Sequence, residues 1–192
     1  MDFAMLYGQN CAGCHGVHGE KGAAYDLANP VYESWVDDAT LAKIIGEGES
    51  GTLMPAFAKS AGGFLTDAQV TALVRGMRTE WRKTGTLPGQ PPLRYAGTLN
   101  GDAGRGERVY QAACAKCHQQ GPRSITSPTY LALVNDKTIR TIVVAGRPDI
   151  GQPDWGGDIA GRALTDQEVA DVVAWLASQR TQAPGKPYPG TR

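Results

Sequence analysis

Hydrophobic residues recur at helical spacing near the end of each half of the chain, at Val70, Leu73, Val74 and Met77 and again at Val169, Val172, Val173 and Leu176. Apolar residues three and four positions apart share one face of an α-helix. The stretches Thr66-Asp-Ala-Gln69 and Thr165-Asp-Gln-Glu168 precede these stripes and have the form of capping boxes. The pattern therefore predicts that each half ends in an amphipathic helix.

The second half of the sequence repeats the first well beyond these helices. The corresponding pairs have the same or similar side chains and are Tyr7/Tyr110, Pro30/Pro128, Tyr32/Tyr130, Asp38/Asp136, Thr40/Thr138, Leu41/Ile139, Ile44/Ile142 and Ile45/Val143. Short helices are predicted to end near Gly46 and Gly146. Asp38 and Asp136, with their neighbours Asp37 and Asn135, can cap the beginnings of these helices. A repeat of this kind indicates two copies of one small helical unit.

Glycine and proline separate the two copies. The segment 84–100 contains Leu87-Pro-Gly-Gln-Pro-Pro-Leu93 and is expected to be a linker. We predict an all-α protein with domains at residues 1–83 and 101–182 and an irregular tail at 183–192.

The cysteines occur as two pairs, each followed directly by a histidine: Cys11-Ala-Gly-Cys14-His15 and Cys114-Ala-Lys-Cys117-His118. This is the attachment signature of haem c. Two thiols on one helical turn can form thioethers with the two vinyl groups of a haem, while the adjacent imidazole reaches the iron. Tyr7 and Tyr110 precede the first cysteine of each pair by one helical turn, where they can pack beside the haem.

Other roles for the cysteines fit less well. A four-thiolate zinc site would need the pairs much closer in sequence, and a thioredoxin-like pair would need alternating strands and helices. Two disulfides would not explain why a histidine directly follows each cysteine pair. We therefore expect two covalently bound haems c.

Charge and hydropathy limit the partners. The 19 basic residues balance the 19 acidic ones, so no net field favours nucleic acid or an acidic membrane. The most apolar stretch, Val169 to Ala177, is interrupted by Asp171, and no transmembrane segment is predicted. The chain begins directly at a predicted helix, which leads us to expect that a signal peptide or anchor has been removed.

Both halves resemble class I cytochrome c domains, and the chain is similar to two-domain diheme cytochromes c from Phe3 to about Arg180. In that family a loop proline carbonyl steadies the histidine, a loop methionine binds the iron, and the last helix crosses the first. Pro30 and Pro128 match the loop proline, and Met54 matches the methionine. The resemblance thus implies His15 and Met54 as ligands of the first iron and His118 as a ligand of the second.

The second half departs from the family at the sixth ligand. No methionine follows the second motif, and Gln152 stands at the position of Met54. Three possibilities for the sixth ligand of the second iron stay open. The amide oxygen of Gln152 binds the iron, or the position holds water or is empty, or a residue from elsewhere in the chain binds. Met77 lies on an apolar helical stripe and is expected in the core, and His18 is expected to be a solvated loop residue. A thioether favours Fe(II), so the first haem should have the higher potential.

These observations favour an electron carrier with two haems, acting on redox partner proteins, among them subunits of a membrane-bound respiratory or photosynthetic complex. The alternative is a diheme enzyme, a peroxidase or an oxidoreductase of small sulfur or nitrogen compounds, with the second haem as its active site. Thioether attachment of haem takes place outside the cytoplasm, so we expect the bacterial periplasm or the outer face of the cytoplasmic membrane. By residue type alone, the haem propionates could be held by Trp35, Arg147, Trp155 and Arg162.

Overall fold

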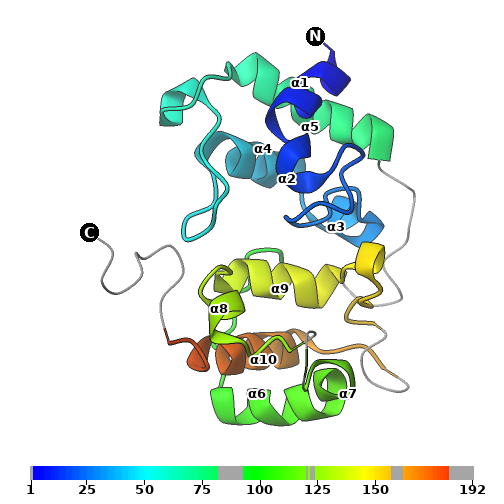
Figure 1. The fold of residues 1–192 in the computed structure, drawn as a ribbon, viewed down its shortest axis with the longest axis vertical. Coiled ribbons are helices and arrows are strands. Elements are labelled where there is room, and N and C mark those ends of the chain that lie inside the picture. The colour runs from blue at the N-terminus through cyan, green and yellow to red at the C-terminus, as the bar shows by residue number, and fades with distance from the viewer. Residues whose placement is uncertain (1, 82–92, 120, 122–123, 157–161, 182–192) are drawn as a thin grey trace. The chain divides into compact units, whose positions relative to one another are not determined.

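The computed structural model describes residues 2–81, 93–119, 121, 124–156 and 162–181, in which helices are joined by turns and loops (Figure 1). Within them, β-structure is limited to two isolated bridges. The chain divides into two compact units. Unit 1 is Met1–Glu49, Met54–Tyr95 and Arg147–Gln152, and unit 2 is Ser50–Leu53, Ala96–Gly146 and Pro153–Arg192. The predicted all-α class with two tandem domains is confirmed.

Unit 1 contains five α-helices in its described residues: α1 (Phe3–Asn10), α2 (Ala12–His15), α3 (Pro30–Trp35), α4 (Asp38–Glu47) and α5 (Asp67–Trp81). Short 3-10 turns lie at Lys59–Ala61 and Pro148–Ile150. Helix α5 packs against α1 and α4. The stripe predicted from the sequence forms the core side of α5, where Leu73 and Met77 are completely buried, so burial of this apolar face fixes the helix on its neighbours.

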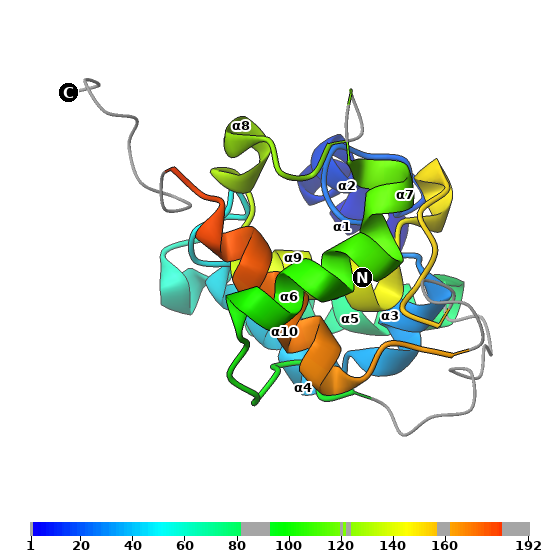
Figure 2. The ribbon, with the colours of Figure 1, turned by 90° about the horizontal axis from the view of Figure 1, so that it is seen from below.

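Unit 2 repeats this arrangement with α6 (Ala103–Val109), a π-helical turn (Tyr110–Cys114), α7 (Ala115–His118), α8 (Pro128–Leu131), α9 (Asp136–Ala145) and α10 (Asp166–Ser178). Helix α10 packs mainly on α6, as the view in Figure 2 shows, and also on α9. The crossing of first and last helix that the resemblance implies is thus present in each unit.

Side-chain caps set where the helices begin. Asp37 accepts a hydrogen bond from the N–H of Thr40 at 2.8 Å, and Asn135 accepts one from Thr138 at 2.7 Å. The predicted neighbours of Asp38 and Asp136 are therefore the N-caps of α4 and α9.

The ends of these helices correspond as well. Helix α4 continues one residue past Gly46 and ends before Gly48, while α9 ends before Gly146. Gly48 and Gly146 have φ of +74° and +68°, a conformation that glycine adopts without strain.

The proposed linker is described only from residue 93 onward. Trp35 donates a hydrogen bond from Nε1 to the carbonyl of Leu93, and its ring lies 4.9 Å from that of Tyr95. This part of the segment packs within unit 1. Residues 84–92 and the predicted tail 183–192 lie outside the described residues, and the predicted domain limits stay a prediction.

Candidate functional site

The first cysteine–histidine motif lies where α1 gives way to α2. The backbone of Cys11 leaves the helical conformation, and its N–H donates to the carbonyl of Tyr7 at 2.8 Å. Cys14 and His15 then follow on the single turn of α2, with Cys14 exposed. All four cysteines of the chain are free of disulfides. Burial raises the pKa of the Cys11 thiol to about 11, so this side chain is protonated at neutral pH as long as nothing is bound to its sulfur.

The imidazole of His15 is held from behind by the backbone. Its Nδ1 lies 2.7 Å from the carbonyl oxygen of Tyr25, which leaves Nε2 for a metal. Burial lowers the pKa of His15, and the neutral imidazole is the form that binds iron.

The expectation that Pro30 supplies this carbonyl is wrong. Pro30 is the first residue of α3, and its carbonyl is directed along that helix. In the second half the carbonyl of Pro128 accepts from the N–H of Ala132 at 3.0 Å. Contact of either proline with a haem stays a prediction.

The two tyrosines that precede the motifs hold the end of each attachment turn. The hydroxyl of Tyr7 donates to the carbonyl of Gly16 at 2.9 Å, and that of Tyr110 donates to the carbonyl of His118 at 2.9 Å. Both side chains are at most 3% exposed. Each hydroxyl therefore links the buried face of the first helix to the turn that carries the histidine.

A tryptophan from the last helix packs on each of these tyrosines, and the sequence did not predict it. The rings of Tyr7 and Trp81 are 4.8 Å apart and nearly perpendicular, whereas those of Tyr110 and Trp175 are 4.3 Å apart and tilted by 34°. Trp81 and Trp175 do not occupy corresponding positions of the repeat, so comparison of the two halves gave no signal for this shared contact.

The two candidate sixth-ligand residues occupy the same place in two similar loops. The N–H of Glu49 donates to the carbonyl of Met54 at 3.1 Å, and the N–H of Arg147 donates to the carbonyl of Gln152 at 3.0 Å. We call the segments 49–54 and 147–152 the ligand loops. Both follow a glycine of positive φ at the end of a helix, and both are closed by backbone groups, so exchange of methionine for glutamine leaves the frame unchanged.

Two control predictions agree with the structure. Met77 is 1% exposed within the core of unit 1, and His18 is exposed. Met54 is half-buried.

Three of the four suggested propionate donors already have partners. Trp35 donates to the carbonyl of Leu93, Arg147 forms an ion pair with Asp149 at 2.7 Å, and Arg162 forms one with Glu168 at 2.6 Å. Trp155 differs, because its Nε1 is buried without a hydrogen-bond partner and the residue is only 1% exposed. A buried N–H without an acceptor is costly, and a propionate oxygen would satisfy it, so this residue fits a haem in the second half.

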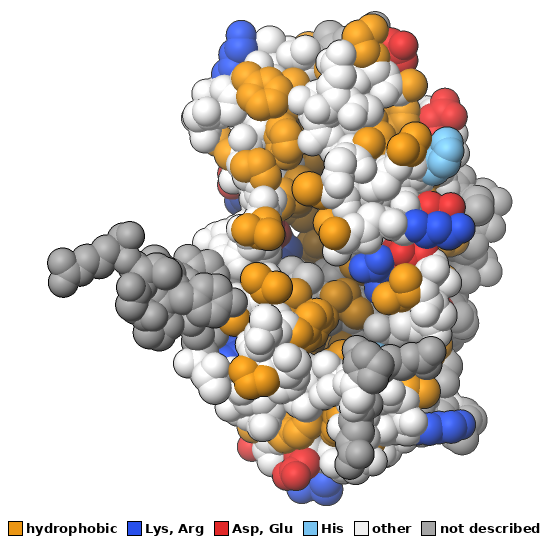
Figure 3. Space-filling model, viewed as in Figure 1, with side chains coloured by type: hydrophobic (Ala, Val, Ile, Leu, Met, Phe, Trp, Pro, Cys, Tyr) orange, Lys and Arg blue, Asp and Glu red, His pale blue; other side chains and the backbone are white. Residues whose placement is uncertain are grey.

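Large hydrophobic side chains lie exposed within both ligand loops and just after the first motif. Val17 follows His15 by two positions and is 73% exposed, Leu53 precedes Met54 and is 90% exposed, and Ile150 is 68% exposed. Hydrophobic side chains gather at several places on the face drawn in Figure 3. Apolar side chains at these sequence positions suit a porphyrin, whose ring surface is itself apolar.

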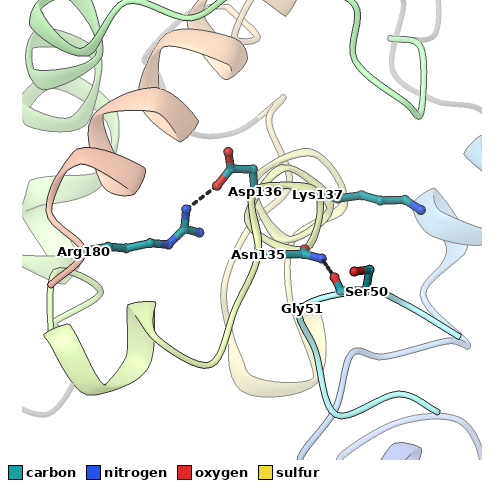
Figure 4. Close-up of a pocket in the computed structure, with 6 residues that line it drawn as sticks. All are labelled: Ser50, Gly51, Asn135, Asp136, Lys137 and Arg180. Atoms are coloured by element: carbon teal, nitrogen blue, oxygen red, sulfur yellow. Dashed lines mark hydrogen bonds and ion pairs between the residues drawn. The ribbon is translucent and has the colours of Figure 1, made fainter. Parts of the chain in front are cut away.

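An open hollow of about 420 Å³ lies in unit 2 (Figure 4), lined by Ser50 and Gly51 of the first ligand loop and by Asn135, Asp136, Lys137 and Arg180. Within it Arg180 pairs with Asp136, and the side-chain amide of Asn135 donates to the carbonyl of Ser50 at 2.8 Å. None of these residues belongs to the attachment motifs or is a candidate iron ligand.

Two helical units with a Cys-x-x-Cys-His turn and a ligand loop in each half of the chain define tandem cytochrome c domains. The chain belongs to the family described as cytochrome c oxidase, cbb3-type, subunit III, which matches residues 1–75 and 101–176. It is therefore a c-type cytochrome, a class that carries covalently bound haem c and transfers electrons.

Individual proteins are similar to this chain over different lengths. The cbb3-type cytochrome c oxidase subunit FixP of Azorhizobium caulinodans is 27% identical over 171 residues, which cover 79% of this chain and 52% of that protein. The chain thus spans about half the length of this relative.

Solved structures are similar as well. The Kuenenia stuttgartiensis reducing HAO-like protein complex Kustc0457/Kustc0458 superimposes with a TM-score of 0.52 at 15% identity, covering 93% of this chain and 95% of that one. The KustC0563 c-type cytochrome is 29% identical with a TM-score of 0.37, covering 43% of this chain and all of that one. The first of these similarities concerns the fold alone. In the described residues, helices of the length and hydropathy that span a membrane do not occur.

Proposed function

We propose that this protein is a diheme c-type cytochrome that passes electrons between redox partner proteins of a respiratory or photosynthetic chain. Haem 1 is attached at Cys11 and Cys14, with His15 and Met54 as axial ligands. Haem 2 is attached at Cys114 and Cys117, with His118 on one side and either Gln152 or an open position on the other. The observation that carries this proposal is the pair of matching ligand loops, each in a half that also carries one attachment turn.

The residues proposed to hold the two haems have different roles. Tyr25 fixes the orientation of the His15 imidazole through Nδ1, and Met54 offers a soft sulfur that stabilises Fe(II). Gln152 offers a hard amide oxygen, which stabilises Fe(III), so haem 2 is expected to have the lower potential. Trp155, whose indole N–H is buried without a hydrogen-bond partner, would donate this N–H to a propionate of haem 2. The haems supply the one-electron chemistry, and the protein keeps their ligands fixed so that little rearranges on electron transfer.

The partners and compartment follow from the same chemistry. The similarity to a subunit of a cbb3-type oxidase supports partners within a membrane-bound electron-transfer complex. Thioether attachment of haem supports the periplasm or the outer face of the cytoplasmic membrane as the site of action.

An exchange of the two ligand-loop residues tests the assignment. Mass spectrometry of protein matured in a host with haem-attachment machinery should find two added haem masses. In a redox titration, Gln152→Met should raise the potential of haem 2 and double the methionine–iron charge-transfer band. The matched variant Met54→Gln should abolish this band and lower the potential of haem 1. One haem, none, or two equally high potentials in the unaltered protein would contradict the proposal.

The second candidate function is a diheme enzyme, and the glutamine at the position of Met54 favours it, because an exchangeable sixth position is what substrate binding at a haem requires. Cyanide, peroxide or thiosulfate added to the purified protein discriminates the two. A rapid change of the Soret band at one haem, with turnover of peroxide or thiosulfate, would support the enzyme. An unchanged spectrum would support the carrier.

A further inference from the structure

Asp26 is a carboxylate enclosed within unit 1. The residue is only 3% exposed, and its Oδ1 has no hydrogen-bond partner. An ionised carboxylate is stable in a protein interior only when hydrogen bonds or a cation replace its water. Proton uptake removes the charge and with it most of this cost.

The groups that face Asp26 do not supply a full set of partners. The titratable and charged groups around it are Tyr7, Glu20, Tyr25, Arg147 and Asp149. Arg147 is the only cation among these groups, and it forms an ion pair with Asp149 at 2.7 Å. Burial raises the pKa of Asp26 to about 6, the charges of Asp149 and Glu20 act in the same direction, and Arg147 and the N–H of Ala28 oppose them. Asp26 can therefore gain or lose a proton near neutral pH.

The position of Asp26 in the chain connects it to the first haem site. It directly follows Tyr25, whose carbonyl oxygen holds Nδ1 of His15. Tyr7 secures the end of the attachment turn, and burial raises the pKa of its hydroxyl group, with smaller contributions in the same direction from the charges of Cys11 and Asp26. The register that aligns Pro30 with Pro128 places Ser124 at the corresponding position of the second half, so haem 2 lacks this carboxylate.

We propose that Asp26 binds one proton from solvent when haem 1 accepts one electron, and releases it when haem 1 is oxidised. This inference rests on the proposed function, because it requires an iron bound behind His15. The electron comes from the redox partner, and iron(III) becomes iron(II) as the carboxylate becomes a carboxylic acid. The site thereby takes up one electron and one proton together, and its net charge stays constant.

Electrostatics gives the direction and size of the effect. The extra positive charge of the oxidised site favours ionised Asp26, and reduction removes that charge. We expect the change of one unit charge at the iron to alter the proton affinity of Asp26 about tenfold. A tenfold change corresponds to about 59 mV for a one-electron couple. The potential of haem 1 should therefore fall by about this amount as the pH rises through the range around 6.

The test is a redox titration of the diheme protein at a series of pH values from 5 to 8, in which the methionine–iron band reports haem 1. The expected result is a potential for haem 1 that falls with rising pH and a potential for haem 2 that changes less. In Asp26→Asn the potential of haem 1 should be high and constant over this range. Glu20→Gln removes the same charge from an exposed neighbour and should retain the pH dependence.

Infrared difference spectroscopy on the unaltered protein provides a second measurement that needs no variant. Reduction of haem 1 at about pH 6 should produce a protonated-carboxyl band. A potential for haem 1 that does not change with pH would overturn the inference about the proton, and so would a pH dependence of this potential that persists in Asp26→Asn. If two haems are attached in such a protein, the proposed function remains intact. Protein without haem at the first motif would overturn both.

Discussion

In both units the first and last helices cross with a glycine on one helix against an aromatic side chain on the other, but the helix that carries the glycine differs. In unit 1 the aromatic side chain comes from the first helix: a Cβ added at Gly76 would lie 2.1 Å from the ring of Phe3. In unit 2 the glycine is in the first helix: a Cβ added at Gly106 would lie 2.7 Å from Cβ of Trp175 and 2.0 Å from the carbonyl oxygen of Asp171. Gly106 corresponds to Phe3 in the repeat, and Trp175 corresponds to Gly76. Close approach of the helices is thus retained, while the large and small partners have changed places.

The arginines that fasten the last helices show a second exchange of this kind. Arg78 donates to the carbonyls of Glu33 and Val36 and to the carboxylate of Asp38. Arg180 donates to the corresponding groups of the second half, the carbonyls of Leu131 and Val134 and the carboxylate of Asp136. Arg180 nevertheless stands one helical turn later than the position that matches Arg78. The acceptors, rather than the helix position of the arginine, are what the two units share.

The largest difference expected between the units concerns these arginines. Arg78 also pairs at 2.7 Å with the carboxylate of Glu33, whose side chain is completely buried, whereas the partner of Arg180 is 62% exposed. Arg78→Met should lower the free energy of unfolding by about 3–5 kcal/mol, because it leaves a buried carboxylate without its cation. Arg180→Met should cost about 1–2 kcal/mol.

Urea denaturation of the holoprotein, with amide exchange followed separately in α5 and α10, measures both effects. The double variant Arg78→Met with Glu33→Gln should regain part of the lost stability, since it removes the buried charge. Equal losses of unfolding free energy in Arg78→Met and Arg180→Met would contradict the expected difference between the two units.

The next effect probes the exchanged glycines. Gly106→Ala should destabilise unit 2 by about 1–3 kcal/mol, because the new methyl group meets the backbone of Asp171, which cannot move without shifting α10. Gly76→Ala should cost less, about 1–2 kcal/mol, since the nearest atoms that the new methyl group meets belong to the side chain of Phe3. The Cβ of Phe3 at 2.7 Å nevertheless requires a small shift of the end of α1 as well as rotation of the ring. Thermal unfolding of each variant provides the measurement.

Gly8→Ala is the matched control for these two substitutions. Nothing lies within 4 Å of a Cβ at Gly8, so the change should stabilise α1 by roughly 0.5–1 kcal/mol through helix propensity. A larger loss of stability in Gly76→Ala than in Gly106→Ala would contradict the expected order of the two effects.

The smallest expected effect is a contrast in pH dependence. Hydrogen bonds from Arg105 lower the pKa of Asp171 in unit 2 to about 2, and Asp171 is 2% exposed. Its stabilisation is complete above the unfolded value of about 4 and is lost as the pH falls toward 2, a decrease of about 1–2 kcal/mol because Arg105 is half-exposed. Asp171→Asn should remove this decrease.

Asp26 in unit 1 should change the pH dependence of stability in the opposite direction. Its pKa is raised to about 6, so the folded unit binds more protons than the unfolded chain between about pH 4 and pH 6. Stability should fall as the pH rises through this window and then stay constant, and Asp26→Asn should abolish the fall. Denaturation midpoints of both variants across pH would show the two slopes, and slopes of the same sign would refute the contrast.

The sequence contains the local part of this architecture. Caps at Asp37 and Asn135, the apolar stripes and the attachment turns each depend on residues within a few positions, so pattern and spacing predict them. Tyr25 could not be found, because the group that holds His15 is a backbone carbonyl that any residue would supply. The burial of Asp26 depends on segments distant in sequence, and so does the fit of Phe3 to Gly76.

The matching ligand loops have a consequence for how such a protein changes over generations. Since backbone groups close both loops, a change of the residue at the position of Met54 or Gln152 leaves the hydrogen bond that closes the loop intact. Two copies of such a domain in one chain can therefore diverge independently at this side chain while both keep the same loop.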